Sequence, residues 1–184
     1  MSTFRGFIAI EINATPNILE FEKEIKKTGA DVKLVESQNI HITLKFLGDV
    51  KENLIDEIEQ IMKDAVKKIQ PFTIKLKGTG VFPNQNYVRV VWIEIKGAQV
   101  IETIANTIDE HLSKLGFKKE KRGFSPHLTI GRVKTAKNKQ QLLKAIEKYV
   151  DVEFSIQEIN SIKLKKSDLT SVGPIYTTIR DVTF

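Results

Sequence analysis

The chain has 184 residues, contains no cysteine and carries a formal net charge of +6. The lack of cysteine excludes a disulfide scaffold, a thiolate zinc site and a cysteine nucleophile, and the length fits one compact domain or two small fused lobes. No apolar run reaches the roughly 18 residues of a membrane-spanning helix and no signal-peptide core follows Met1, so we expect a cytoplasmic protein without a membrane partner.

Hydrophobic periodicity predicts alternating strands and helices along the whole chain. In the first half we expect strands at 4–12, 32–35, 41–47 and 72–82, and helices at 16–27 and 53–69. In the second half we expect strands at 87–95, 127–133, within 152–164 and at 176–184, and helices at 99–115 and 137–149. Proline at a helix start (Pro16) and glycine after helix ends (Gly29, Gly116) mark several of these boundaries.

The two halves follow the same order: strand, helix, histidine-bearing strand, helix, strand. His41 and His127 are 86 residues apart, and the similar segments Phe72-Thr73-Ile74 and Phe154-Ser155-Ile156 are 82 apart. This near-constant offset indicates a duplicated βαβαβ-type unit. We therefore expect one two-lobed domain over 1–184, with halves of about 1–86 and 87–184, strands exchanged between the lobes, and a pseudo-two-fold axis that brings both histidine strands to one central cleft.

Two histidines of the three in the chain occur in one repeated pattern, His-x-Thr, within His41-Ile42-Thr43-Leu44 and His127-Leu128-Thr129-Ile130. Residues i and i+2 of a strand point to the same side, so each pattern presents an imidazole beside a hydroxyl. A single copy arises easily by chance, whereas two copies at matching places in similar halves indicate a site. The third histidine, His111, lies in a predicted helix without a threonine two residues on, and we expect it at the surface.

A pair of imidazoles suits the opening of a five-membered cyclic phosphodiester. One imidazole takes the proton of the attacking water while the other protonates the departing alkoxide, on opposite sides of one phosphorus. Thr43 and Thr129 would bind the non-bridging oxygens, and Arg132 would add positive charge, although an exposed strand-end charge explains Arg132 equally well. The histidine spacing does not match a zinc or iron site, so no metal and no cofactor are expected.

Longer segments around these patterns resemble the two-histidine phosphoesterases, and within them the bacterial and archaeal RNA 2′,3′-cyclic phosphodiesterases, also called 2′-5′ RNA ligases. The resemblance spans nearly the whole chain. The segments that carry it are Phe4-Arg5-Gly6-Phe7-Ile8-Ala9, Asn39-Ile40-His41-Ile42-Thr43-Leu44-Lys45-Phe46-Leu47-Gly48, Arg89-Val90-Val91-Trp92, Phe124-Ser125-Pro126-His127-Leu128-Thr129-Ile130-Gly131-Arg132 and Gly173-Pro174-Ile175-Tyr176.

The resemblance implies a bilobal α+β fold with two mainly antiparallel sheets lining the central cleft. It implies hydrolysis of a terminal 2′,3′-cyclic phosphate to a 2′-phosphate, with 2′-5′ ligation to a 5′-hydroxyl end as a related reaction. His41 would be the proton donor and His127 the acceptor; the residues alone leave this choice open, because the two halves look equivalent. Phosphate or RNA binding would fall to the basic and aromatic side chains of the matched segments, Arg132, Lys45, Arg89 and Tyr176.

The expected partner is RNA ending in a 2′,3′-cyclic phosphate, such as a transfer-RNA fragment, bound by a monomer. The positive charge fits RNA, but a solvated lysine-rich surface explains it equally well. Two alternatives remain. One is a cyclic phosphodiesterase acting on small nucleotides such as ADP-ribose cyclic phosphate or 2′-5′ oligoadenylate. The other is a protein that binds an RNA end without turnover.

Overall fold

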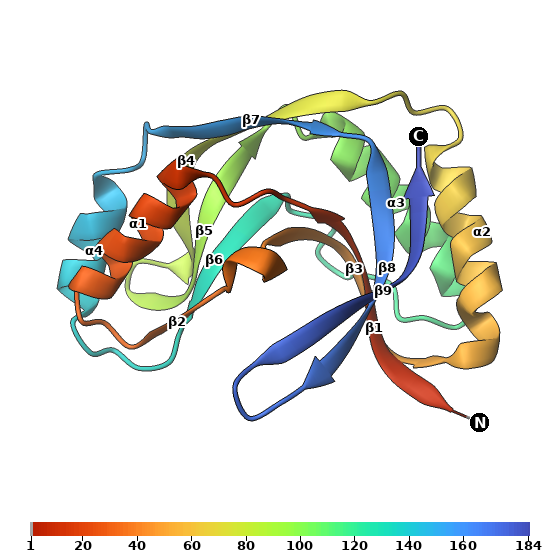
Figure 1. The fold of residues 1–184 in the computed structure, drawn as a ribbon, viewed down its shortest axis with the longest axis horizontal. Coiled ribbons are helices and arrows are strands. Elements are labelled where there is room, and N and C mark those ends of the chain that lie inside the picture. Colours follow the sequence, from red (N-terminus) through yellow and green to blue (C-terminus); the bar gives the residue numbers. More distant parts are fainter. Residues whose placement is uncertain (1) are drawn as a thin grey trace.

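Two antiparallel β-sheets with helices on their outer sides make up the part of the chain that the computed structural model describes, residues 2–184 (Figure 1). The first sheet has four strands, in the order β3 (His41–Lys51), β1 (Thr3–Glu11), β8 (Ser161–Leu169) and β9 (Pro174–Thr183). The second has five strands, in the order β2 (Val32–Leu34), β6 (His127–Val133), β5 (Tyr87–Lys96), β4 (Phe72–Asn84) and β7 (Glu153–Ile159).

Four α-helices cover the two sheets from outside. They are α1 (Pro16–Lys27), α2 (Ile55–Val66), α3 (Gln99–Lys114) and α4 (Lys139–Glu147). Helix α2 packs against α3 and β9, and α3 packs against β3, so this pair lies by the first sheet, on the right of Figure 1. Helix α1 packs against α4, β2 and β7, which places the other pair by the second sheet. No helix in the described residues is long and apolar enough to cross a membrane.

Each sheet combines strands from both halves of the sequence. In the first sheet β3 and β1 continue into β8, and in the second sheet β6 and β5 continue into β4. The order is the same in both: the histidine-bearing strand, the opening strand of its half, and then a strand supplied by the other half. The predicted α+β fold with two mainly antiparallel sheets is confirmed, and each sheet contains strands from both halves.

Local signals explain most element boundaries. Pro16 occupies the first turn of α1 after an extended Thr15, and the buried residues of α3 recur at helical spacing, at Ile101, Ile104, Ala105, Ile108 and Leu112. The strand predicted to end at Leu47 instead continues to Lys51. It does so because Gly48, at φ +68°, takes a left-handed conformation and pairs with Gly6 beside a register shift.

A buried ion pair connects β3 to α3 and to the loop that follows α3, residues 115–126. The side chain of Lys45 is 1% exposed, and its Nζ lies 2.5 Å from Asp109 Oδ1 and 2.6 Å from the carbonyl oxygen of Lys118. The backbone N–H of Glu120 donates to Asp109 Oδ2 at 3.2 Å. A buried charge needs such a set of partners, so Lys45 and Asp109 together hold one strand, one helix and one loop in register.

Substitution of Lys45 by Met should lower the free energy of unfolding by on the order of 3 kcal/mol, because the buried carboxylate of Asp109 loses its counter-charge. Urea denaturation measures the change. Lys51→Met, on the same strand but exposed, is the matched control and should change stability by less than about 0.5 kcal/mol. Equal losses in the two variants would show that the Lys45–Asp109 pair does not tie these elements together.

Candidate active site

His41 and His127 are the first residues of β3 and β6, and each ring is fixed by the backbone just before it. His41 Nδ1 lies 2.6 Å from the carbonyl oxygen of Asn39, and His127 Nδ1 lies 2.7 Å from that of Ser125. A carbonyl oxygen only accepts hydrogen bonds, so the proton of each neutral ring sits on Nδ1. Both imidazoles therefore turn Nε2 away from the backbone, as the nitrogen that can exchange a proton with a ligand.

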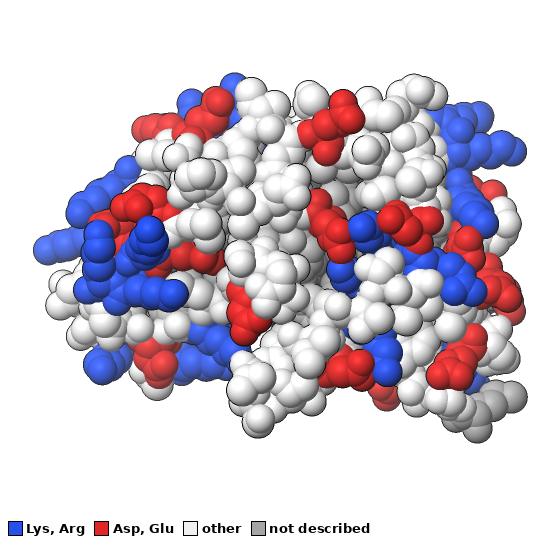
Figure 2. All heavy atoms as spheres, viewed as in Figure 1, with Lys and Arg blue, Asp and Glu red and all other residues white. Residues whose placement is uncertain are grey.

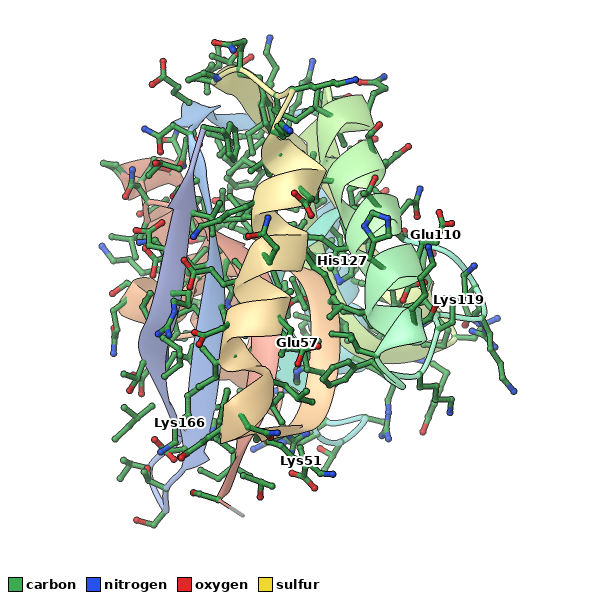
Figure 3. All side chains as sticks on the ribbon, turned by 90° about the vertical axis from the view of Figure 1, so that its right-hand side faces the viewer. Lys51, Glu57, Glu110, Lys119, His127 and Lys166 are labelled. Atoms are coloured by element: carbon green, nitrogen blue, oxygen red, sulfur yellow. The ribbon has the colours of Figure 1, made fainter. Side chains whose placement is uncertain are left out.

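The two histidines line one cavity of about 320 Å³ between β3 and β6, together with both threonines of the His-x-Thr patterns. Thr43 Oγ1 lies 3.0 Å from His41 Nε2, so the hydroxyl can donate to that nitrogen when no ligand is bound. Arg132 and Tyr176 also line the cavity. In Figure 3, which looks over α2 and α3, His127 lies behind these helices in the interior. Because residues i and i+2 of a strand point to the same side, both His-x-Thr patterns direct an imidazole and a hydroxyl toward this cavity.

Aromatic rings hold both imidazoles from the side. The His41 ring packs against Phe7, with centroids 5.1 Å apart, and edge-on against Tyr176 at 5.4 Å. The His127 ring meets Phe82 edge-on at 5.0 Å, and Phe82 in turn packs against Trp92 at 5.1 Å. Packing of this kind restricts the rings to one orientation, which is what proton transfer at a defined atom requires.

The electrostatic environment of His41 favours the neutral ring. Burial lowers the pKa of His41 below its usual value, and the positive charges of Lys165 and Arg132 lower it further. The hydrogen bond to the Asn39 carbonyl and the charge of Glu11 oppose this shift without overcoming it. A negative charge in the cavity, such as a bound phosphate, would favour a proton on Nε2 of His41.

The remaining residues predicted for the site lie in different surroundings. Lys45 borders the cavity, but its ammonium is already satisfied by Asp109 and the Lys118 carbonyl, so it is not available to bind phosphate. Arg89 lies outside the cavity, with its guanidinium over the ring of Tyr87 at 5.1 Å. In the pairing of β5 with β4 the register shifts from Phe82–Val90 to Pro83–Val88, so Arg89 lies at an irregularity of the strand that sequence resemblance does not reveal.

Further residues of the cavity wall were not among those predicted for the site. Asn106 of α3 and Phe124 and Ser125 of the loop 115–126 face it. Asn106 and Asp109 are three residues apart, so they share one side of α3, beside its buried stripe. Polar side chains are ordinary on that side of an amphipathic helix, so the sequence held no signal that marks this pair. Among residues 2–184, no three His, Cys, Asp or Glu side chains gather in a way that could hold a metal ion.

Comparison with known proteins gives a consistent picture. The model of the 2′-5′ RNA ligase superfamily matches residues 14–168. A Methanocaldococcus jannaschii protein named RNA 2′,3′-cyclic phosphodiesterase is 50% identical over 96% of this chain and 99% of its own length. A Methanothermobacter thermautotrophicus protein of the same name is 37% identical over 94% of this chain and 95% of its own length.

Solved structures share the fold at low sequence identity. The TT0787 protein of Thermus thermophilus superimposes with a TM-score of 0.82 at 22% identity, over 97% of each chain. The E. coli LigT protein, solved in complex with 3′-AMP, superimposes with a TM-score of 0.71 at 21% identity, over 99% of this chain and 98% of its own.

The His41 ring should titrate with a midpoint below the ordinary histidine value of about 6.5, measured by NMR of the ring protons. Because the unfolded chain takes up this proton more readily than the folded one, stability should fall as pH drops below about 6.5 through the lowered pKa, and His41→Gln should remove this part of the pH dependence. Inorganic phosphate should raise the midpoint. A midpoint at or above 6.5 without phosphate would contradict the burial argument.

Proposed function

This chain belongs to the 2′-5′ RNA ligase superfamily, and we propose from this membership that it is an RNA 2′,3′-cyclic phosphodiesterase that converts a terminal 2′,3′-cyclic phosphate to a 2′-phosphate. The observation that carries the proposal is the shared cavity, which His41 and His127 line from two different sheets. A phosphorus atom between two such rings has a proton acceptor on one side and a proton donor on the other, as in-line displacement requires.

In the proposed reaction His127 Nε2 accepts a proton from water while the water oxygen forms a bond to phosphorus. The bond between phosphorus and the ribose 3′-oxygen breaks, and the imidazolium of His41 gives its Nε2 proton to that oxygen. His41 ends neutral and His127 ends protonated, and exchange with solvent restores the starting state. A 5′-hydroxyl in place of water forms a 2′-5′ linkage by the same steps.

We assign His41 as a donor that carries its proton when substrate is bound, and its surroundings support this assignment. The free ring is neutral near pH 7, because burial lowers its pKa. The negative charge of the cyclic phosphodiester favours the imidazolium, so the proton is recruited together with the substrate. Thr43, Thr129 and Arg132 would bind the non-bridging oxygens, where negative charge grows in the transition state. Tyr176 would fix the His41 ring from its edge rather than contact phosphate.

The proposal extends to the substrate and the working state. The net charge of +6 supports an RNA end over a small nucleotide, and cleaved transfer RNA is one source of such ends. We assign the activity to a cytoplasmic monomer. The reaction needs no metal, since the two imidazoles account for both proton transfers.

Replacement of either His41 or His127 by Ala should reduce hydrolysis of an RNA oligonucleotide ending in a 2′,3′-cyclic phosphate by about 10²–10⁴-fold, because one proton transfer is lost. The rate of 2′-phosphate formation in the presence of EDTA is the measurement. His111→Ala is the control and should keep full activity, since His111 does not line the cavity. An inactive wild-type protein that still binds the RNA end would favour a binding protein over an enzyme.

A substrate with sulfur in place of the ribose 3′-oxygen should separate the two proton-transfer roles. A thiolate leaves without protonation near neutral pH, because thiol pKa values of about 8.5 lie far below those of alcohols. His41→Ala should therefore recover most of its lost rate with this substrate, whereas His127→Ala should not. Recovery by His127→Ala alone would reverse the assignment of donor and acceptor.

A further inference from the structure

A second hollow adjoins the site cavity, and we call it the basic groove. It is lined by Phe46, Leu47 and Gly48 of β3 and by residues 118–122 of the loop 115–126, and its volume is about 490 Å³. Phe46 and Glu120 line both the groove and the site cavity. The two spaces are therefore adjacent, with Phe46 and Glu120 at the boundary between them.

The groove carries an excess of positive charge. Its four basic side chains make no ion pair with any acidic residue in the described part of the chain; they are Lys118, Lys119, Lys121 and Arg122. The single acidic residue, Glu120, lies 3.5 Å from Lys45 Nζ, which offsets part of its charge. Figure 3 shows Lys119 on the outside of the loop, beyond α3. On the face seen in Figure 2, basic and acidic side chains lie together on both sides of a mostly uncharged vertical band.

An exposed aromatic ring marks the boundary between the groove and the site cavity. Phe46 is 61% exposed, although it lies in the middle of β3. Its register partner on β1 is Phe7, whose ring packs against His41. Cross-strand partners share one face of a sheet, so Phe46 projects from the face that carries His41. An exposed ring beside basic side chains is how proteins hold single-stranded nucleic acid, by stacking on bases and pairing with phosphates.

The loop that carries these charges is held in place from within. Lys45 Nζ donates to the Lys118 carbonyl at 2.6 Å, and the Glu120 N–H donates to Asp109 Oδ2 at 3.2 Å. These bonds fix the backbone on both sides of Lys119. A preorganised loop loses less conformational entropy when it binds a ligand than a free one does. The buried Lys45 thus supports the groove without itself meeting the ligand.

We propose that the basic groove binds the RNA strand on the 5′ side of the terminal cyclic phosphate, an inference that rests on the proposed function. The terminal nucleotide occupies the site cavity, whose volume of about 320 Å³ suits a small ligand rather than a longer chain. The next base stacks on Phe46, and the following phosphates meet Lys119, Lys121 and Arg122. The groove then makes RNA chains better substrates than single cyclic nucleotides.

The test compares a single 2′,3′-cyclic nucleotide with a ten-nucleotide RNA ending in a 2′,3′-cyclic phosphate. In the triple variant Lys119→Glu, Lys121→Glu, Arg122→Glu, KM for the RNA should rise by about 10- to 100-fold, and the slope of log KM against log salt should shrink by about 2. Rates with the single nucleotide should stay as in the wild type. Phe46→Ala should raise KM for the RNA by about 10-fold through loss of stacking.

The matched control reverses the same number of charges elsewhere. Lys23, Lys67 and Lys68 are exposed, line neither the site cavity nor the groove, and make no ion pair in residues 2–184. Their triple change to Glu should leave KM for the RNA within about two-fold of the wild type at 0.15 M salt, where distant charges are screened. An equal rise in both triple variants would overturn the inference, because net charge alone would explain it.

Other outcomes keep the inference and the proposed function apart. If the wild type hydrolyses the RNA and the loop variant has an unchanged KM for it, the groove does not bind the strand, although the proposed function stands. If the loop variant loses activity on the single nucleotide as well, the loop shapes the catalytic site, and the strand-binding inference fails. A wild type inactive on both substrates would remove the proposed function itself.

Discussion

The antiparallel pairing of β1 with β8 and of β5 with β4 is the constraint on which the rest of the molecule depends. Each pairing joins a strand of one half to a strand of the other, so neither half can complete a sheet without its counterpart. The two sheets are therefore held as one unit, with the edge strand β3 beside β6. Because both histidine patterns begin these two strands, the pairing also sets the geometry of the cavity.

The site depends on a balance between burial and charge. Burial orients the His41 ring against Phe7 and Tyr176, and the same burial lowers its pKa. In the proposed mechanism, an anion in the cavity would favour the charged form of this ring and so couple its protonation to substrate binding. Local backbone carbonyls reinforce this arrangement, because they hold the Nδ1 proton of both rings and leave Nε2 facing the cavity.

Lys45 illustrates how a residue in a recognisable motif can serve the fold. It lies two residues after Thr43, and resemblance alone assigned it to phosphate or RNA. Its partner Asp109 is 64 residues away along the chain, and only the packing of α3 against β3 brings the two together. The resulting buried pair anchors the loop 115–126, which supplies the Ser125 carbonyl to His127 and the basic side chains to the groove.

The sequence by itself determined the elements, their repeated order and the two His-x-Thr patterns, because periodicity, strand parity and turn chemistry act over a few neighbouring positions. The family followed from the resemblance of longer segments. Pro16 and the histidine strand at 127–133 were predicted at their observed boundaries. Only the tertiary structure decided the burial of His41, the ion pair between Lys45 and Asp109 and the position of Arg89 outside the cavity. These properties depend on contacts between segments far apart in the sequence, and the residue pattern within one segment does not predict such contacts.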